Sequence, residues 1–352
     1  MEHSLDLTYH WAGFSALVVF VIAYAFVMAE EFTHLRKSKP VVLAAGLIWG
    51  MIAIAYSNTP HYEMVEHEIR HSFLEYTELA FFLLVAMTYI NALEERNVFN
   101  SLKSWLIKNQ FSYRQLFWIT GVLAFFLSPL ADNLTTALVL CAVVVAVGSS
   151  SPKFVGLACV NIVVAANAGG AFSPFGDITT LMVWQAGQLD FLQFFALVIP
   201  SVVNYIIPAS IMHFFVSDHK PDVAETSVTI KYGGKTIILL GLLTIVTAVS
   251  FHNFLHLPPV FGMMTGLAYL QLYSFYIKIS VKDIEEQKYD FFENVARVEW
   301  DTLLFFFGVI LSVGGLGFIG YLEYVSEFMY TDLGATTANV LVGILSAIVD
   351  NI

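Results

Sequence analysis

Two short segments combine a proline, an aspartate and paired hydroxyl residues inside mostly apolar sequence. The first is SPLADNLTT at residues 128–136, and the second is SPFGDITT at residues 173–180, 45 positions later. In each, the proline is expected to end one half-helix, and the Asp-Thr-Thr run can cap and begin the next. Freed carbonyls, a carboxylate and hydroxyls together form the oxygen-only shell that hard cations such as sodium prefer. The candidate ligands are Ser128, Asp132, Asn133, Thr135, Thr136, Ser173, Asp177, Thr179 and Thr180.

Each aspartate could instead serve only as the N-cap of a half-helix. A charge near the middle of a bilayer costs at least about 2.5–3.5 kcal/mol, whereas serine or threonine would cap without that cost. The occurrence of Asp132 and Asp177 at two similar breaks therefore favours ion binding at both carboxylates. Upstream of the second break, the glycine-rich run at residues 167–172 predicts unwound backbone. Asn161 and Asn167 could line the same cavity or serve only in packing.

The overall composition excludes a soluble fold. Of 352 residues, 58% are hydrophobic and 12% are charged, and the mean hydropathy is +0.73, whereas a soluble domain has about 25% charged residues. The net charge of −12 offers no basic patch to a nucleic acid. The two cysteines, Cys141 and Cys159, give neither a disulfide framework nor a metal signature. The sequence therefore predicts an all-α polytopic membrane protein.

Apolar stretches of about 20 residues, the length that crosses a bilayer, recur along the chain. They are expected at residues 11–29, 40–56, 79–93, 115–148, 154–187, 191–216, 236–251, 258–277, 302–321 and from 336 onward. Residues 61–75 are expected to form a solvated amphipathic loop. The block at residues 115–148 is too long for one helix and short for two, and Pro129 interrupts it. We interpret this block as a re-entrant hairpin.

The basic residues are consistent with that hairpin. With the N-terminus outside and a hairpin that returns to its starting side, 15 of the 16 Lys and Arg residues lie on the cytoplasmic side, and only Arg70 lies outside. A single crossing would invert every later loop, against the tendency of basic residues to remain inside. Two short but complete membrane spans would also return the chain to its starting side, so the charges do not distinguish them from a hairpin.

An internal repeat relates the two halves of the chain. Residues 127–134 (LSPLADNL) recur as residues 345–352 (LSAIVDNI), and residues 78–82 (ELAFF) align with residues 301–305 (DTLLF). In the predicted topology the first hairpin opens inward and the second outward, which is the inverted repeat typical of secondary transporters. Asp350 and Asn351 are expected to supply mirrored ion ligands. Glu78, expected at the start of its helix, is a further candidate.

The repeat divides the chain into four parts. Residues 1–113 form N-terminal scaffold helices, and residues 114–216 hold the first hairpin, the broken helix and the helix that follows, which together form the ion-binding region. Residues 217–235 form a cytoplasmic linker, and residues 236–352 form the second repeat. Because the chain stops within the second Asp-Asn break, which would leave half a hairpin without partners, we expect it to be C-terminally truncated.

Two longer motifs resemble a known family. SPLADNLTTALVLCAVVVAVG at residues 128–148 and NIVVAANAGGAFSPFGDITTLMVWQAG at residues 161–187 resemble signature stretches of the NhaD-type sodium/proton antiporters. These belong to the ion-transporter superfamily, which also contains arsenite and dicarboxylate carriers. The resemblance runs from about the second helix to the end of the chain. Asp132, Asn133 and Asp177 match the family's polar motif positions, as do Asp350 and Asn351.

The resemblance implies export of Na⁺ or Li⁺ in exchange for protons, in a fold with scaffold helices, two opposed hairpins and broken helices. It implies a secondary transporter rather than an enzyme, located in the bacterial plasma membrane. No cofactor is expected beyond the transported ions, and the resemblance allows a homodimer. Asp132 and Asp177 would bind Na⁺ and H⁺ alternately.

Two other functions are consistent with parts of the sequence. An anion permease for dicarboxylate or arsenite would favour neutral Ser, Asn and Thr side chains at half-helix N-termini, because a carboxylate there repels the substrate. An intramembrane aspartyl hydrolase would need two acids in contact, typically with a Gly-Asp motif, which Gly176-Asp177 matches in part. The aspartates at both breaks favour a cation. No Walker motif occurs, so ATP-driven transport is not expected.

Overall fold

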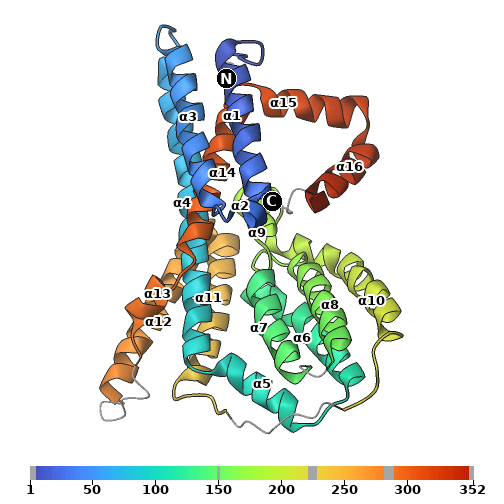
Figure 1. Cartoon of the computed structure of the whole chain (residues 1–352). Helices are drawn as coiled ribbons and strands as arrows, with labels where there is room; N and C mark the ends of the chain where they lie inside the picture. The colour runs from blue at the N-terminus through green and yellow to red at the C-terminus, as the bar shows by residue number, and fades with distance from the viewer. Residues whose placement is uncertain (1–4, 149–150, 221–227, 281–288, 349–352) are drawn as a thin grey trace. The chain divides into compact units, whose positions relative to one another are not determined.

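The computed structural model describes residues 5–148, 151–220, 228–280 and 289–348, and every regular element within these ranges is helical (Figure 1). Nine helical stretches in the described part of the chain are long and apolar enough to cross a membrane. The protein is therefore an all-α, multi-pass membrane protein, which confirms the expectation from composition. The chain divides into two compact units, Met1–Ala80 with Glu299–Ile352, and Phe81–Val298.

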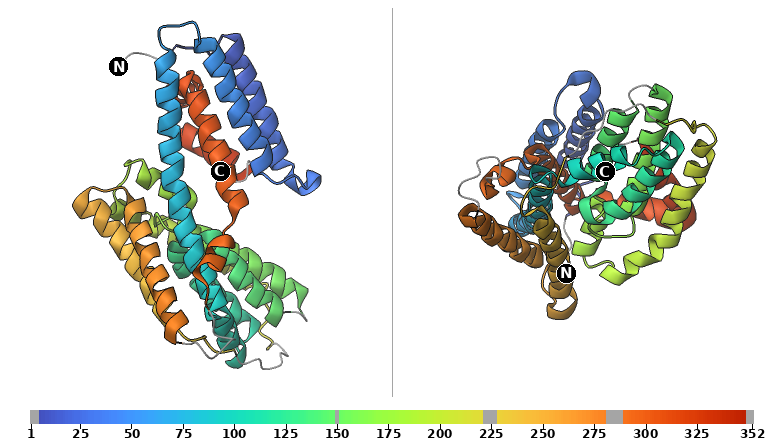
Figure 2. Two further views of the ribbon diagram at one scale, coloured as in Figure 1. Left: turned by 90° about the vertical axis from the view of Figure 1, so that its left-hand side faces the viewer. Right: turned by 90° about the horizontal axis from the view of Figure 1, so that it is seen from below.

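The first unit is built around α3, which packs against α1 on one side and α14 on the other (Figure 2). Trp49 of α3 donates a hydrogen bond from Nε1 to the Leu311 carbonyl of α14 over 2.8 Å. Gly308 of α14 lies so close to α3 that an added Cβ would come within 2.5 Å of the Val41 backbone. The helices of this unit are α1 (Trp11–Met28), α2 (Glu30–Thr33), α3 (Ser38–Tyr56), the first part of α4 (Tyr62–Glu95), α14 (Trp300–Phe318), α15 (Tyr321–Ser326), a π-helical turn (Glu327–Asp332) and α16 (Ala335–Ile348).

Helix α4 corrects one expectation. It has 34 residues and a length of about 51 Å, well beyond the roughly 30 Å of a bilayer's hydrocarbon core. The solvated loop expected at residues 61–75 is helical instead. Glu66 and Arg70 lie on one face, where they pair at 2.6 Å and i,i+4 spacing, while Val65 and Ser72 are buried on another. This period of about 3.6 residues is the helical signal that the high charge of the segment obscured.

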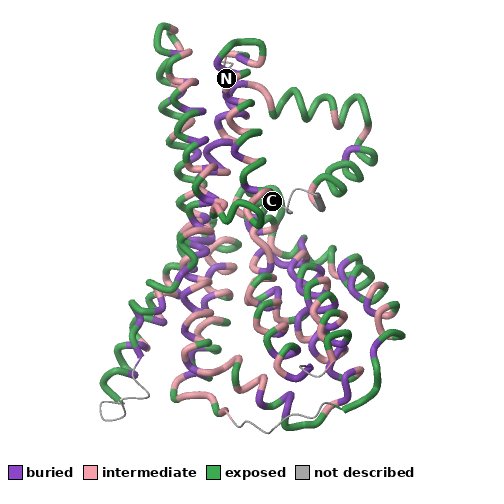
Figure 3. Tube along the Cα trace, in the orientation of Figure 1, coloured by how far each residue is buried: buried purple, intermediate pink, exposed green. Residues whose placement is uncertain are grey.

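The second unit contains a bundle in which α8 packs against α6, α7 and α10, with buried side chains along the shared faces (Figure 3). Beside it, α11 and α12 pack closely because Gly262 and Gly266 leave room for Ala248 and Thr244. The helices of this unit are the end of α4, α5 (Val98–Lys108), α6 (Tyr113–Ala131), α7 (Asn133–Val147), α8 (Pro152–Gly170), α9 (Ile178–Gln185), a 3₁₀ helix (Phe191–Leu197), α10 (Val198–His213), α11 (Gly234–Leu255), α12 (Pro259–Ser280) and α13 (Phe291–Ala296).

Several basic helix ends meet at one end of the second unit. The ring of Tyr113, at the start of α6, packs at a tilt against that of Phe154 at the start of α8, with centroids 4.3 Å apart, and the Tyr113 N–H donates to the His219 carbonyl after α10. The Lys231 N–H, before α11, donates to the Arg96 carbonyl after α4. The chain therefore passes through α6 and α7 and returns to the end from which it started, as both the predicted re-entrant hairpin and two complete spans require.

Arg96 anchors that end of the second unit. Its side chain is fully buried, pairs with Glu95 at 2.7 Å, and lies 4.9 Å over the Tyr289 ring. Burial raises the pKa of Tyr289 well above its usual range, with a further contribution from Glu95. The guanidinium lies over the ring face, the geometry of a cation–π contact.

Candidate ion site

The first break lies at Asp132 rather than at the proline. Pro129 is inside α6, which continues to Ala131, so the expectation that this proline ends the half-helix is wrong. A proline removes only the hydrogen bond to the carbonyl four residues earlier, here that of Phe125. Gly169 of α8 packs against this carbonyl, and a Cβ at Gly169 would come within 2.1 Å of the oxygen. Helix α8 therefore packs directly against the carbonyl that Pro129 leaves without its helical hydrogen bond.

Asp132 itself has an unusual backbone conformation. Its φ of 57° and ψ of 161° lie in a region that side chains other than glycine rarely occupy. Such a conformation costs about 1–3 kcal/mol, and it tends to persist where the surrounding structure holds it for function. The strain therefore marks Asp132 as the point at which the hairpin turns.

The second break is longer. Helix α8 ends at Gly170 and α9 begins at Ile178, with turns between them. The expectation that the glycine-rich run is unwound is wrong for Gly169 and Gly170, which are still helical. These glycines allow close approach instead: a Cβ on Gly170 would lie 2.5 Å from the Gly176 carbonyl oxygen. The loop therefore folds back onto the end of its own helix.

Both aspartates cap the helices that follow the breaks. Asp132 Oδ1 accepts the Thr135 N–H at 2.8 Å, and Oδ2 accepts the Thr135 hydroxyl at 2.8 Å. Asp177 Oδ1 likewise accepts the N–H and the hydroxyl of Thr179, at 2.9 and 2.8 Å. Each carboxylate therefore lies at the positive end of a half-helix, as the Asp-Thr-Thr pattern predicts.

Asn133 joins the two breaks. Its Nδ2 donates to Asp177 Oδ2 at 2.7 Å and to Asn167 Oδ1 at 3.0 Å. The Ser173 hydroxyl adds a second tie by donating to the Pro129 carbonyl at 3.1 Å. Segments that are 45 residues apart in sequence thus form one polar cluster. Asn161 is not part of these ties: it is buried and donates its Nδ2 to the Phe117 carbonyl at 2.9 Å.

Two hydroxyls of the predicted site have unused hydrogen-bonding capacity. Ser128 is fully buried and Thr136 is 4% exposed, and neither side-chain oxygen has a partner within the described residues. Ser128 Oγ lies beside Gly170, 3.1 Å from where a Cβ on that glycine would be. The Thr180 hydroxyl, by contrast, donates to the Ser173 and Asp177 carbonyls at 2.9 and 2.8 Å. An unpaired buried hydroxyl costs about 1–3 kcal/mol, which a bound cation would offset.

The polar cluster at the two breaks combines many neutral oxygen atoms with few charged groups. Within the described residues, no group of three or more His, Cys, Asp or Glu side chains could hold a metal ion. Carboxylate, hydroxyl and carbonyl oxygens with little excess negative charge suit a hard monovalent cation.

The remaining candidate residues have different outcomes. Glu78 is half-buried in the interior of α4, so the expectation that it starts its helix is wrong, and it belongs to the first unit, whereas both breaks belong to the second. Asp350 and Asn351 lie outside the described residues. At the aligned position of the second half, Asp301 does lie in the first turn of α14, where it accepts the Ser38 hydroxyl at 2.5 Å.

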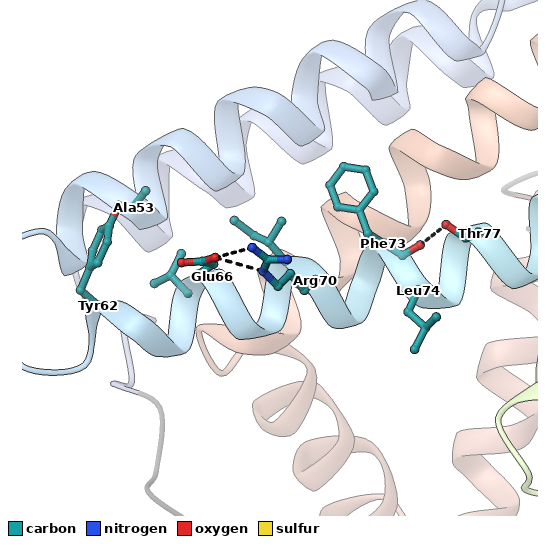
Figure 4. Close-up of a pocket in the computed structure, with 9 residues that line it drawn as sticks. Ala53, Tyr62, Glu66, Arg70, Phe73, Leu74 and Thr77 are labelled. Carbon is teal, nitrogen blue, oxygen red and sulfur yellow. Dashed lines mark hydrogen bonds and ion pairs between the residues drawn. The ribbon is translucent and has the colours of Figure 1, made fainter.

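An open groove of about 730 Å³ occurs in the first unit, along the start of α4 and the end of α3 (Figure 4). Its lining is mainly apolar, including Ile69, Phe73 and Leu74, with the Glu66–Arg70 pair as its charged part. The groove contains none of the predicted ion ligands.

Comparisons with known proteins give a consistent result. The family model described as "Citrate transporter" matches residues 11–352. The chain is 52% identical to the Na⁺/H⁺ antiporter NhaD of Vibrio cholerae, over 99% of this chain and 78% of that protein, and 51% identical to NhaD of Alkalimonas amylolytica, over 99% and 76%. It is 31% identical to sodium/proton antiporter 1 of Arabidopsis thaliana, over 95% of this chain and 58% of that protein.

Proposed function

This chain belongs to the NhaD-type sodium/proton antiporters, within the citrate transporter family, and we propose that it exports Na⁺ or Li⁺ in exchange for H⁺. It is a transporter rather than an enzyme, as its relatives are. We further propose that it lies in the bacterial plasma membrane with its N-terminus outside, that it needs no cofactor, and that it forms a homodimer.

The observation that carries the proposed mechanism is the bridge formed by Asn133. Its Nδ2 donates to Asp177 Oδ2, while Asp132, its neighbour in the chain, caps the adjacent helix. Through this bridge the Asp177 carboxylate is hydrogen-bonded to Asn133, the residue that follows Asp132 in the chain. Two helix N-termini stabilise the ionised forms, and the buried hydroxyls of Ser128 and Thr136 add neutral ligands.

Exchange follows from competition between ions. Two carboxylates beside one monovalent ion are hard to keep fully ionised in a low-dielectric cavity. In the proposed cycle, Na⁺ binding expels a proton from the pair of Asp132 and Asp177, and proton binding expels Na⁺. Glu78 in the first unit, with Asp350 and Asn351, remains a proposed member of the pathway.

An anion permease of the same family is the main alternative, because the matching family model is described as a citrate transporter. The same carboxylates disfavour it, since an anion at the N-terminus of α7 or α9 would face Asp132 or Asp177. An aspartyl hydrolase has no support among the relatives, which are named as antiporters or transporters.

A transport assay distinguishes Na⁺/H⁺ exchange from anion transport. In everted membrane vesicles that carry this protein and lack other antiporters, adding NaCl at alkaline pH is expected to release protons from the acidified lumen. Potassium citrate should have no such effect. Citrate uptake that needs no sodium, together with no response to NaCl, would contradict the proposal.

A further inference from the structure

Phe175 lies within the second break, two residues before Asp177, and its ring is surrounded by other aromatic rings. The centroid distances are 5.4 Å to Phe82 of α4, 5.5 Å to Trp184 of α9 and 6.3 Å to Phe191 of the 3₁₀ helix. We propose that this aromatic pocket, formed by Phe82, Trp184 and Phe191, makes Phe175 a positioning residue that holds Asp177 in place for sodium. The inference rests on the proposed antiport function.

The pocket is rigid, although the break is not helical. Trp184 is fully buried and Phe82 is 2% exposed, so neither ring can move without disturbing its surroundings. The three rings come from different elements, and tilted or edge-on contacts like these are the favoured geometries of aromatic pairs. The Phe175 ring therefore fixes the middle of the break relative to α4, α9 and the 3₁₀ helix.

The chain between the ring and the carboxylate depends on that anchor. Gly176 separates Phe175 from Asp177 and packs against the end of α8, where an added Cβ would come within 2.5 Å of the Gly170 Cα. If the ring leaves the pocket, we expect this packing to loosen, and with it the position of Asp177, whose Oδ2 accepts a hydrogen bond from Asn133 Nδ2 at 2.7 Å. The ring thus acts on the ion site through the backbone, without touching the ion.

Within the part of the chain that the structure describes, the first break has no aromatic anchor at the matching position. Leu130 occupies the position that corresponds to Phe175, and it is 48% exposed within the helical part of α6. There the strained backbone of Asp132 and the contact between Gly169 and the Phe125 carbonyl set the geometry instead. The two breaks share a motif, but they are held in place by different means.

The test measures sodium dependence in variants of the whole protein. Phe175→Ala removes all three aromatic contacts, and it is expected to raise the apparent KM for Na⁺ by about tenfold and to leave the rate at saturating Na⁺ within about twofold. Phe175→Leu should give a smaller rise. Phe126→Ala, the same truncation on a 65% exposed face of α6, is the control and should leave KM unchanged.

A double-mutant cycle separates positioning from a general loss of structure. Trp184→Leu should also raise KM, and adding Phe175→Ala to it should raise KM less than the product of the single effects, because both act through one contact. Fully multiplicative effects, or an unchanged KM in Phe175→Ala and Phe175→Leu with wild-type protein levels, would overturn the inference. A wild-type protein that moves no protons with Na⁺ would instead refute the proposed function.

Discussion

At the scale of single residues, the structure gives Asp132 and Asp177 two roles that one substitution can separate. Each carboxylate caps a helix, and asparagine caps a helix about as well as aspartate. Asp132→Asn and Asp177→Asn should therefore keep the fold, with a midpoint of thermal unfolding close to wild type. Each is expected to lower sodium-dependent proton movement in everted vesicles by at least about 10–100-fold.

A variant that keeps near-normal sodium affinity and rate would show instead that its aspartate only caps a helix.

Ser128 offers a second test at this scale, because its buried hydroxyl makes no hydrogen bond within the described residues. Ser128→Ala removes no intramolecular bond, so thermal stability should be unchanged or slightly higher. If the hydroxyl is an ion ligand, the apparent KM for Na⁺ should rise by about tenfold.

Thr120→Ala is the matched control for Ser128. It is also buried in α6, but its hydroxyl donates to the Leu116 carbonyl at 2.8 Å. That variant should lose about 0.5–1.5 kcal/mol of stability and keep its KM. An equal KM for Ser128→Ala and wild type would exclude Ser128 as a ligand.

At the scale of helices, glycines decide how closely the bundle packs around the breaks. A Cβ on Gly169 would come within 2.1 Å of the Phe125 carbonyl oxygen, and no flexible side chain can yield there. Gly169→Ala should therefore push α8 away from α6, lower stability by about 1–3 kcal/mol and impair transport.

Gly156 provides the comparison on the same helix. It is exposed, and nothing lies within 4 Å of an added Cβ. Gly156→Ala should be neutral or stabilising by up to about 1 kcal/mol, because alanine favours a helix. The measurement compares the midpoints of thermal unfolding of Gly169→Ala and Gly156→Ala in detergent. A stable, active Gly169→Ala protein would show that the close contact is not required.

The positions of most helices could be predicted from the sequence, and the exceptions have physical causes. Long apolar segments mark helices such as α1, α3 and α14 within a few residues, because nothing else in a bilayer satisfies the backbone. The exact break at Asp132 could not be predicted, since local sequence does not settle whether a helix ends at a proline or continues past it, as α6 does at Pro129. The bridge from Asn133 to Asp177 is likewise a tertiary contact that no local pattern encodes.

For the whole molecule, the proposed topology of every later segment depends on the chain returning through α6 and α7 to the side from which it entered. The start of α6 and the start of α8 meet through Tyr113 and Phe154, so the proposed topology places Lys153 in the cytoplasm. In a background without Cys141 and Cys159, a cysteine at Lys153 should react only with reagents applied from inside. A cysteine at the exposed Asn58, between α3 and α4, should react only from outside.

Labelling of position 153 from outside would contradict both the hairpin and the inverted repeat. The repeat itself remains a prediction, because the second Asp-Asn pair, Asp350 and Asn351, lies outside the described residues.

Sodium and protons are proposed to compete for the carboxylates of Asp132 and Asp177. Linkage then requires apparent sodium affinity to weaken as the pH falls, by up to about tenfold per pH unit for each proton displaced, and to level off at alkaline pH where no proton remains.

Competition between the two ions can be measured as sodium-induced proton release from the purified protein, in weakly buffered solution across a pH series. Sodium addition is expected to release protons, with less release at more alkaline pH, where fewer protons remain bound. Release should be lost in the double variant Asp132→Asn with Asp177→Asn. Sodium binding that releases no proton at any pH would contradict the competitive mechanism.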